Sequence, residues 1–113
     1  MSKRDINLYL EDIIDSSKAI KEFVGEMSFE EFINDRKTYS ATIREYIIIG
    51  EAVSNLIEEL EEKIPQYPWR MVKDFRNFIV HEYFGVDPEI VWDLTMQELD
   101  EMVNNIKKIR DNK

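Results

Sequence analysis

The middle of the chain carries the apolar spacing of one face of a long helix. Between residues 39 and 64, steps of four and three alternate through Tyr39, Ile43, Tyr46, Gly50, Val53, Ile57, Leu60 and Ile64. Because an α-helix has 3.6 residues per turn, side chains at these steps lie on one face. The pattern predicts one unbroken helix that stops before Pro65.

A glycine stands inside this predicted helix. Gly50 costs about 1 kcal/mol relative to alanine in a helix interior. Two explanations stay open: another helix approaches closely at this point, or a ligand needs the room.

Helical spacing continues on both sides of this segment. A first helix is expected over residues 6–24, ending near Gly25, and Ser28 with Glu31 fits a capping box for a short helix to about residue 35. These elements place at least three helices before Pro65.

The second half of the chain predicts further helices. Pro68 is expected as the first residue of a helix over residues 68–83, and Asp87 with Pro88 as the start of the last helical segment. A second capping-box pattern predicts that this segment breaks and restarts near residue 95. The pattern consists of Thr95 and Glu98, and the apolar face that follows of Met96, Leu99, Val103 and Ile106. We therefore predict an all-α, up-and-down bundle of four to five helices, as a single domain over residues 1–113.

Composition narrows the possible functions. The absence of cysteine excludes disulfides and cysteine-based metal sites, and the glutamates of residues 58–63 are expected to form a solvated helix face. The net charge of −9 argues against broad binding of nucleic acid, so contact with a polyanion must be local. No stretch approaches the ~20 apolar residues that span a bilayer. We expect a cytoplasmic protein without membrane contact, metal or cofactor.

The stretch RNFIVHEYFG, residues 76–85, holds the only histidine of the chain. On a helix, Lys73, Asn77 and His81 form a stripe that Arg76 borders, and Tyr83 lies two turns above Arg76. The opposite sector, expected to face the core, consists of Val72, Phe75, Phe78 and Ile79.

This polar stripe has the chemistry needed to cleave RNA without a metal. Histidine can donate or accept a proton near neutral pH, and arginine can hold a phosphate and stabilise charge that develops on it. Because one histidine cannot easily be base and acid at once, a symmetric dimer would supply the second. Structural explanations of the same residues stay open. His81 would interact with the dipole at a helix C-terminus, Arg76 would pair with a glutamate of the long helix, and Tyr83 would be a core tyrosine.

The motif R-N-x-x-x-H-x-Y resembles the R-x4-H-x-Y signature of the HepT-like (DUF86) branch of the HEPN superfamily. Two flanking stretches are also similar to that family. They are I-G-E-A at residues 49–52 and V-D-x-x-x-V/I-W at residues 86–92, present here as Val86-Asp87 through Val91-Trp92. The resemblance covers nearly the whole chain and implies a HEPN-type bundle.

The resemblance implies a function as well. It implies a metal-independent endoribonuclease toxin of a toxin–antitoxin pair, working as a homodimer whose two motifs meet at the interface. It implies that Arg76 and His81 are catalytic, with support from Asn77. The implied partner is a MntA-type nucleotidyltransferase that silences the nuclease by AMPylation of Tyr83. Glu51 is a supporting candidate, with a buried salt bridge to Arg76 as the equally weighted alternative.

An acidic chain needs a local basic patch to bind RNA, and functions other than RNA cleavage also stay open. Arg70 and Lys73, with Arg76, could form the local basic patch that contacts RNA phosphates. One rival is a non-catalytic nucleotide-binding or scaffold subunit of a nucleotidyltransferase complex, and another is a plain helical dimerisation module.

Overall fold

The computed structural model describes residues 5–82 and 85–112. Within these ranges every regular element is helical, as predicted. The elements are α1 (Ile6–Val24), α2 (Phe29–Asn34), α3 (Arg36–Asn55), α4 (Ile57–Lys63), α5 (Trp69–His81), α6 (Pro88–Asp93), a single π-helical turn (Leu94–Glu98) and α7 (Leu99–Asp111). None of the described helices is both long enough and apolar enough to cross a membrane.

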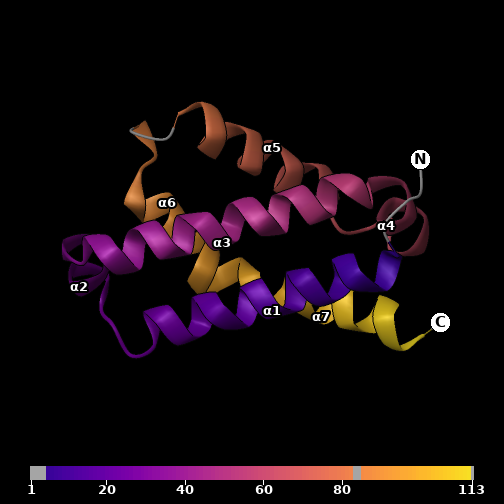
Figure 1. The fold of residues 1–113 in the computed structure, drawn as a ribbon, viewed down its shortest axis with the longest axis horizontal. Coiled ribbons are helices and arrows are strands. Elements are labelled where there is room, and N and C mark those ends of the chain that lie inside the picture. The colour runs from indigo at the N-terminus through magenta and orange to yellow at the C-terminus, as the bar shows by residue number, and fades with distance from the viewer. Residues whose placement is uncertain (1–4, 83–84, 113) are drawn as a thin grey trace.

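Helix α3 forms the centre of the bundle (Figure 1). α1 packs along one side of α3 and α5 along the other, while α7 packs against α1. α5 is therefore an outer helix, and one of its sides faces away from the bundle.

Several helix starts follow local capping rules as predicted. Ser28 and Glu31 form the expected capping box, with the Ser28 hydroxyl accepting from Glu31 N–H at 3.1 Å and the Glu31 carboxylate from Ser28 N–H at 2.9 Å. Asp87 caps α6, and Pro88 is its first residue. Gly25 ends α1 with φ of 52°, a conformation that favours glycine.

The prediction of one unbroken helix over residues 39–64 is wrong. α3 ends at Asn55, and Leu56 takes a non-helical conformation before α4 begins at Ile57. The Leu56 N–H is shared between the carbonyls of Ala52 and Val53, which interrupts the regular ladder. Leu56 is buried at this bend, as are Val53 before it and Leu60 after it. The apolar residues therefore face the core as the spacing indicates, although the helix is interrupted.

The second predicted capping box is also wrong. Thr95 lies inside the π-helical turn, and its buried hydroxyl donates to the Val91 carbonyl at 2.8 Å and pairs with the Tyr46 hydroxyl at 2.6 Å. The helix therefore widens by one residue instead of breaking. This shift leaves Met96 43% exposed and buries Met102 together with Leu99.

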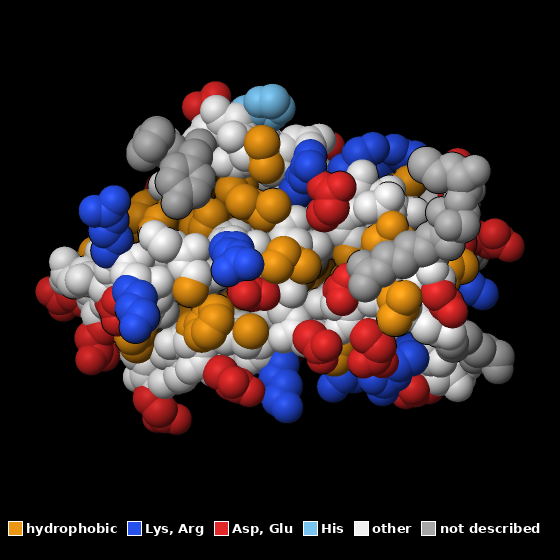
Figure 2. All heavy atoms as spheres, in the orientation of Figure 1, with side chains coloured by type: hydrophobic (Ala, Val, Ile, Leu, Met, Phe, Trp, Pro, Cys, Tyr) orange, Lys and Arg blue, Asp and Glu red, His pale blue; other side chains and the backbone are white. Residues whose placement is uncertain are grey.

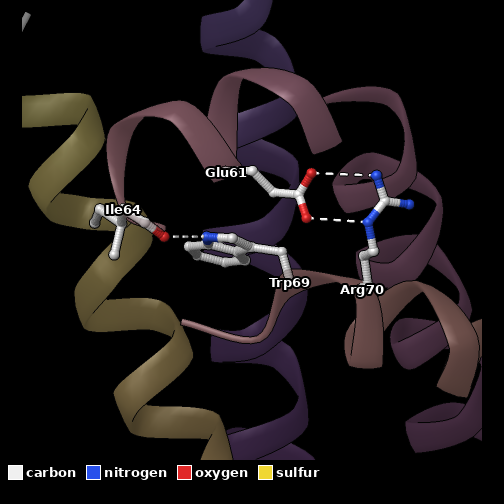
Figure 3. Close-up of polar contacts among 4 residues, drawn as sticks. All are labelled: Glu61, Ile64, Trp69 and Arg70. Carbon is white, nitrogen blue, oxygen red and sulfur yellow. Dashed lines mark hydrogen bonds and ion pairs between the residues drawn. The ribbon is translucent and has the colours of Figure 1, made fainter. Parts of the chain in front are cut away.

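Helix α5 is shorter than predicted. It begins at Trp69, with Pro68 as its N-cap residue, and ends at His81, with Glu82 as its C-cap. The Trp69 ring is buried, and its Nε1–H donates to the Ile64 carbonyl at 2.9 Å, which fixes the turn before α5 (Figure 3). Phe78, expected in the core, is 41% exposed because α5 is covered on one side only.

Candidate active site

Arg76 lies directly against Gly50 where α5 packs on α3. A Cβ atom built on Gly50 would lie 2.1 Å from Arg76 Cβ and 2.6 Å from Arg76 Cγ. Of the two explanations for this mid-helix glycine, the close approach of another helix is confirmed. The helix that approaches is the one that carries the motif arginine.

The Arg76 guanidinium is held at two of its three nitrogens. Nη2 donates to Glu51 Oε2 at 2.5 Å, and Nη1 donates to Asn77 Oδ1 at 2.7 Å. The Arg76 side chain is 30% exposed and Glu51 is 56% exposed, so the expected ion pair exists but is not buried. We call this arrangement of Arg76, Glu51 and Asn77 the arginine clamp.

The clamp leaves donors of Arg76 unused. Nε is buried and has no hydrogen-bond partner among the described residues. A buried donor without a partner costs about 1–3 kcal/mol. Such a cost is common where a group is held for binding or chemistry rather than for stability.

His81 stands at the exposed C-terminal end of α5. Figure 2 shows the single histidine, in pale blue, projecting at the edge of the molecule. His81 lies five positions after Arg76, so the two side chains leave the helix about 140° apart. Within one chain the helix therefore does not aim both side chains at the same point.

The other predicted site residues have different surroundings. Arg70 forms a two-bond ion pair with Glu61, with Nε and Nη2 at 3.0 and 3.2 Å from its oxygens (Figure 3). This pair is largely exposed, and such pairs contribute little to stability, so Arg70 can exchange Glu61 for another anion. Lys73 is partly exposed on α5, and Tyr83 lies outside the described residues.

A mostly apolar groove of about 530 Å³ opens beside the first turns of α5. Its aromatic and methionine side chains follow helical spacing, but the sequence did not predict that they would line a groove. Its lining consists of Tyr46, Tyr67, Pro68, Met71, Val72, Phe75, Ile90, Leu94, Glu98, Leu99 and Met102.

Acidic and histidine side chains do not gather into a metal-binding group in the part of the chain that the structure describes. The candidate site thus offers a clamped guanidinium, an amide and an exposed imidazole on one outer helix. These groups can bind a phosphate and transfer protons.

The fold and this helix define an all-α bundle of the HEPN type. Residues 13–109 match the family described as Ribonuclease HepT-like, and the chain belongs to that family. The match includes every described residue of the candidate site.

Curated relatives cover almost the whole chain. "Putative RNase MJ0127" of Methanocaldococcus jannaschii is 40% identical over 96% of this chain and 90% of its own. "Probable ribonuclease HepT" of Thermococcus cleftensis is 37% identical over 96% of this chain and 98% of its own. "Putative RNase TTE0752" of Caldanaerobacter subterraneus subsp. tengcongensis is 39% identical over 89% of this chain and 90% of its own. No solved structure gives a significant match.

Proposed function

We propose that this chain is a metal-independent endoribonuclease and the toxin of a toxin–antitoxin pair. The observation that carries the proposal is that α5 holds both the arginine clamp and an exposed histidine, in a chain whose relatives are named ribonucleases. Arg76 and His81 are the catalytic residues in this proposal, and Asn77 and Glu51 support them.

Each group has a defined task in the proposed reaction. A histidine takes the proton of a ribose 2′-hydroxyl, whose oxygen attacks the adjacent phosphorus. The bond from phosphorus to the 5′-oxygen breaks, and that oxygen receives a proton. The products are a 2′,3′-cyclic phosphate and a 5′-hydroxyl. Arg76 stabilises the negative charge on the phosphorane, because its free N–H groups can donate to phosphate oxygens.

The proposed working unit is a homodimer. Two copies would supply two His81 side chains, one as base and one as acid, and would place one copy's histidine near the other copy's arginine. Exposed apolar side chains on α5 and α6 support a contact between the two copies through these helices. They are Met71, Phe78, Val80 and Ile90.

RNA binding would rest on a small basic area. Arg70 and Lys73 extend from Arg76 along α5, and the two-fold axis would double them. In the chain as a whole, 24 acidic residues outnumber 15 basic ones, which gives the net charge of −9. Few phosphate contacts imply a shallow dependence of RNA binding on salt.

The proposed regulation acts on Tyr83. A MntA-type nucleotidyltransferase would transfer AMP from ATP to the tyrosine hydroxyl and release pyrophosphate. The added phosphate is negative and would compete with RNA for the guanidinium of Arg76.

Cleavage of labelled RNA by purified protein tests this function directly. Wild type should cleave RNA equally with and without EDTA and leave 2′,3′-cyclic phosphate ends. Arg76→Ala and His81→Ala should each lose at least about 100-fold in rate, the usual scale for losing a general acid–base or a charge-stabilising group.

The controls separate lost chemistry from lost folding. Arg36→Ala removes an exposed cation at the start of α3 and should cleave like wild type. His81 is exposed, so its replacement should change the free energy of unfolding by no more than about 0.5 kcal/mol. Full activity in His81→Ala or Arg76→Ala would rule out the proposed catalytic pair.

A further inference from the structure

The contact between Gly50 and Arg76 is closer than any side chain at position 50 would allow. Real Cβ atoms essentially never lie within 3.0 Å of another heavy atom, yet a Cβ here would lie 2.1 Å from Arg76 Cβ and 3.4 Å from Arg76 Cα. Because those atoms belong to the α5 backbone or are fixed to it, rotation of the arginine side chain cannot relieve the clash. α5 itself would have to move.

The arginine clamp is built from the residues on either side of this contact. Glu51 follows Gly50 on α3, and Asn77 follows Arg76 on α5. The Glu51 bond joins the two helices, whereas the Asn77 bond lies within α5. A movement of α5 away from α3 would therefore break the Glu51 bond and leave the Asn77 bond in place.

We infer that Gly50 is a positioning residue for Arg76: the missing side chain lets α5 approach α3 closely enough for Glu51 to fix the direction of the guanidinium. This inference rests on the proposed function, since it gives the clamp a role in RNA cleavage. Gly50 touches no substrate atom and acts through Arg76 alone. Its effect should appear in the turnover rate more than in the binding of RNA.

Gly50→Ala tests the effect on cleavage. We expect the maximal rate to fall about 100-fold, the loss that a misplacement of about 1 Å can cause, with a smaller change in KM. Gly85→Ala is the matched control, since among the described residues a Cβ there meets Glu82 Oε2 alone, at an ordinary 3.7 Å. Gly85→Ala should cleave within about twofold of wild type. Unchanged maximal rate in folded Gly50→Ala would overturn the inference.

The guanidinium signals of Arg76 in ¹⁵N NMR report the clamp without RNA. Bonds to Glu51 and Asn77 hinder rotation of the guanidinium, so wild type should show separate Nη–H signals at low temperature. Arg76→Lys removes these signals and thereby assigns them. Gly50→Ala should merge them, and separate signals in that variant would overturn the inference. If wild type cleaves no RNA, the proposed function fails, while this measurement still decides whether Gly50 holds the clamp.

A second pair of variants covers the case in which Gly50→Ala does not fold. Replacing Arg76 by glycine removes the Cβ and Cγ atoms that clash, leaving only Cα at 3.4 Å. In that background, Gly50→Ala should keep or raise the midpoint of thermal unfolding, because alanine favours helix. An equal loss of stability in both backgrounds would show that the contact is not with Arg76 and would overturn the inference.

Discussion

At the scale of the single residue, Arg76 combines polar groups that have hydrogen-bond partners with one that has none among the described residues. Its guanidinium has bonds to Glu51 and Asn77, yet its buried Nε lacks a partner among the described residues. In the proposed reaction, the RNA phosphate accepts from the N–H groups of Nη1 and Nη2 that the clamp leaves free, because each of these nitrogens carries two hydrogens.

At the same scale, Tyr83→Phe should separate nuclease activity from its silencing. The proposed cleavage uses Arg76 and His81 but not the phenol, so the variant should cleave RNA within about threefold of wild type. Without the hydroxyl it cannot accept AMP, and it should stay active after incubation with the nucleotidyltransferase and ATP. Mass spectrometry measures the gain of AMP. Tyr67→Phe is the control, and it should still be modified.

Two results would refute this role for Tyr83. The first is an equal gain of mass in Tyr83→Phe and wild type, which would place the modification elsewhere. The second is a wild-type protein that never gains AMP from any nucleotidyltransferase encoded beside it.

At the scale of the element, α5 has two apolar sides. Ile79 is buried against the bundle and Phe75 packs edge-on against Tyr46 of α3, while Met71 and Phe78, seven residues apart, lie on a more exposed side. This spacing is typical of a helix that packs against a second helix. α5 therefore supports the proposed contact between two copies.

Phe78→Asp should convert the proposed dimer to a monomer. A carboxylate at the centre of a helix contact would be buried without a partner, which is costly. Sedimentation at micromolar concentration should show the change of mass, and RNA cleavage should fall at least about tenfold because each copy lacks the other's His81. Helix content by circular dichroism should stay unchanged.

The matched control is Ile33→Asp on α2, because Ile33 is 43% exposed and Phe78 is 41% exposed. Ile33→Asp should keep the mass and activity of wild type. A wild-type protein that is monomeric yet fully active would contradict the dimer proposal.

At the scale of the whole molecule, two tyrosines with raised pKa values make the free energy of unfolding depend on pH in alkaline solution. Burial, with the nearby carboxylates of Glu98 and Glu101, raises the pKa of Tyr67 to about 12. Burial also raises the pKa of Tyr46, although its bond to Thr95 acts in the opposite direction. Both phenols therefore hold their protons more tightly in the folded chain than in the unfolded chain.

This linkage predicts a loss of stability in alkali. Below pH 10 the phenols are protonated in both states, and the full stability is present. As pH rises from 10 to 12, the unfolded state loses protons first, so the free energy of unfolding should fall. For Tyr67 we expect a fall of about 1 kcal/mol, reduced because the ring is only partly buried. Urea unfolding at several pH values measures it.

Tyr67→Phe removes one of these phenols and should flatten the fall between pH 10 and 12. Tyr9→Phe provides a comparison at a tyrosine of α1, away from the groove. A wild-type protein whose free energy of unfolding rises over this range would contradict the assigned direction.

The sequence by itself determined the features whose partners lie within a few residues. The capping box of Ser28 and Glu31 and the start of α6 at Asp87 form as predicted, because each uses groups two or three positions apart. The helical class and the polar stripe of α5 follow from the same local periodicity. The roles of Arg76, His81 and Tyr83 in RNA cleavage and its control stay predictions.

Only the tertiary structure decided the features whose partners are distant in the chain. Thr95 fits a capping box by spacing, yet its hydroxyl bonds to Tyr46, 49 residues away, and a π-helical turn results. In the sequence, the glycine at position 50 indicated only that a neighbouring group comes close to the helix there. In the folded chain that group is Arg76 of α5. Such contacts depend on how two helices pack, and a periodic pattern on one helix does not encode which residue of another helix it will meet.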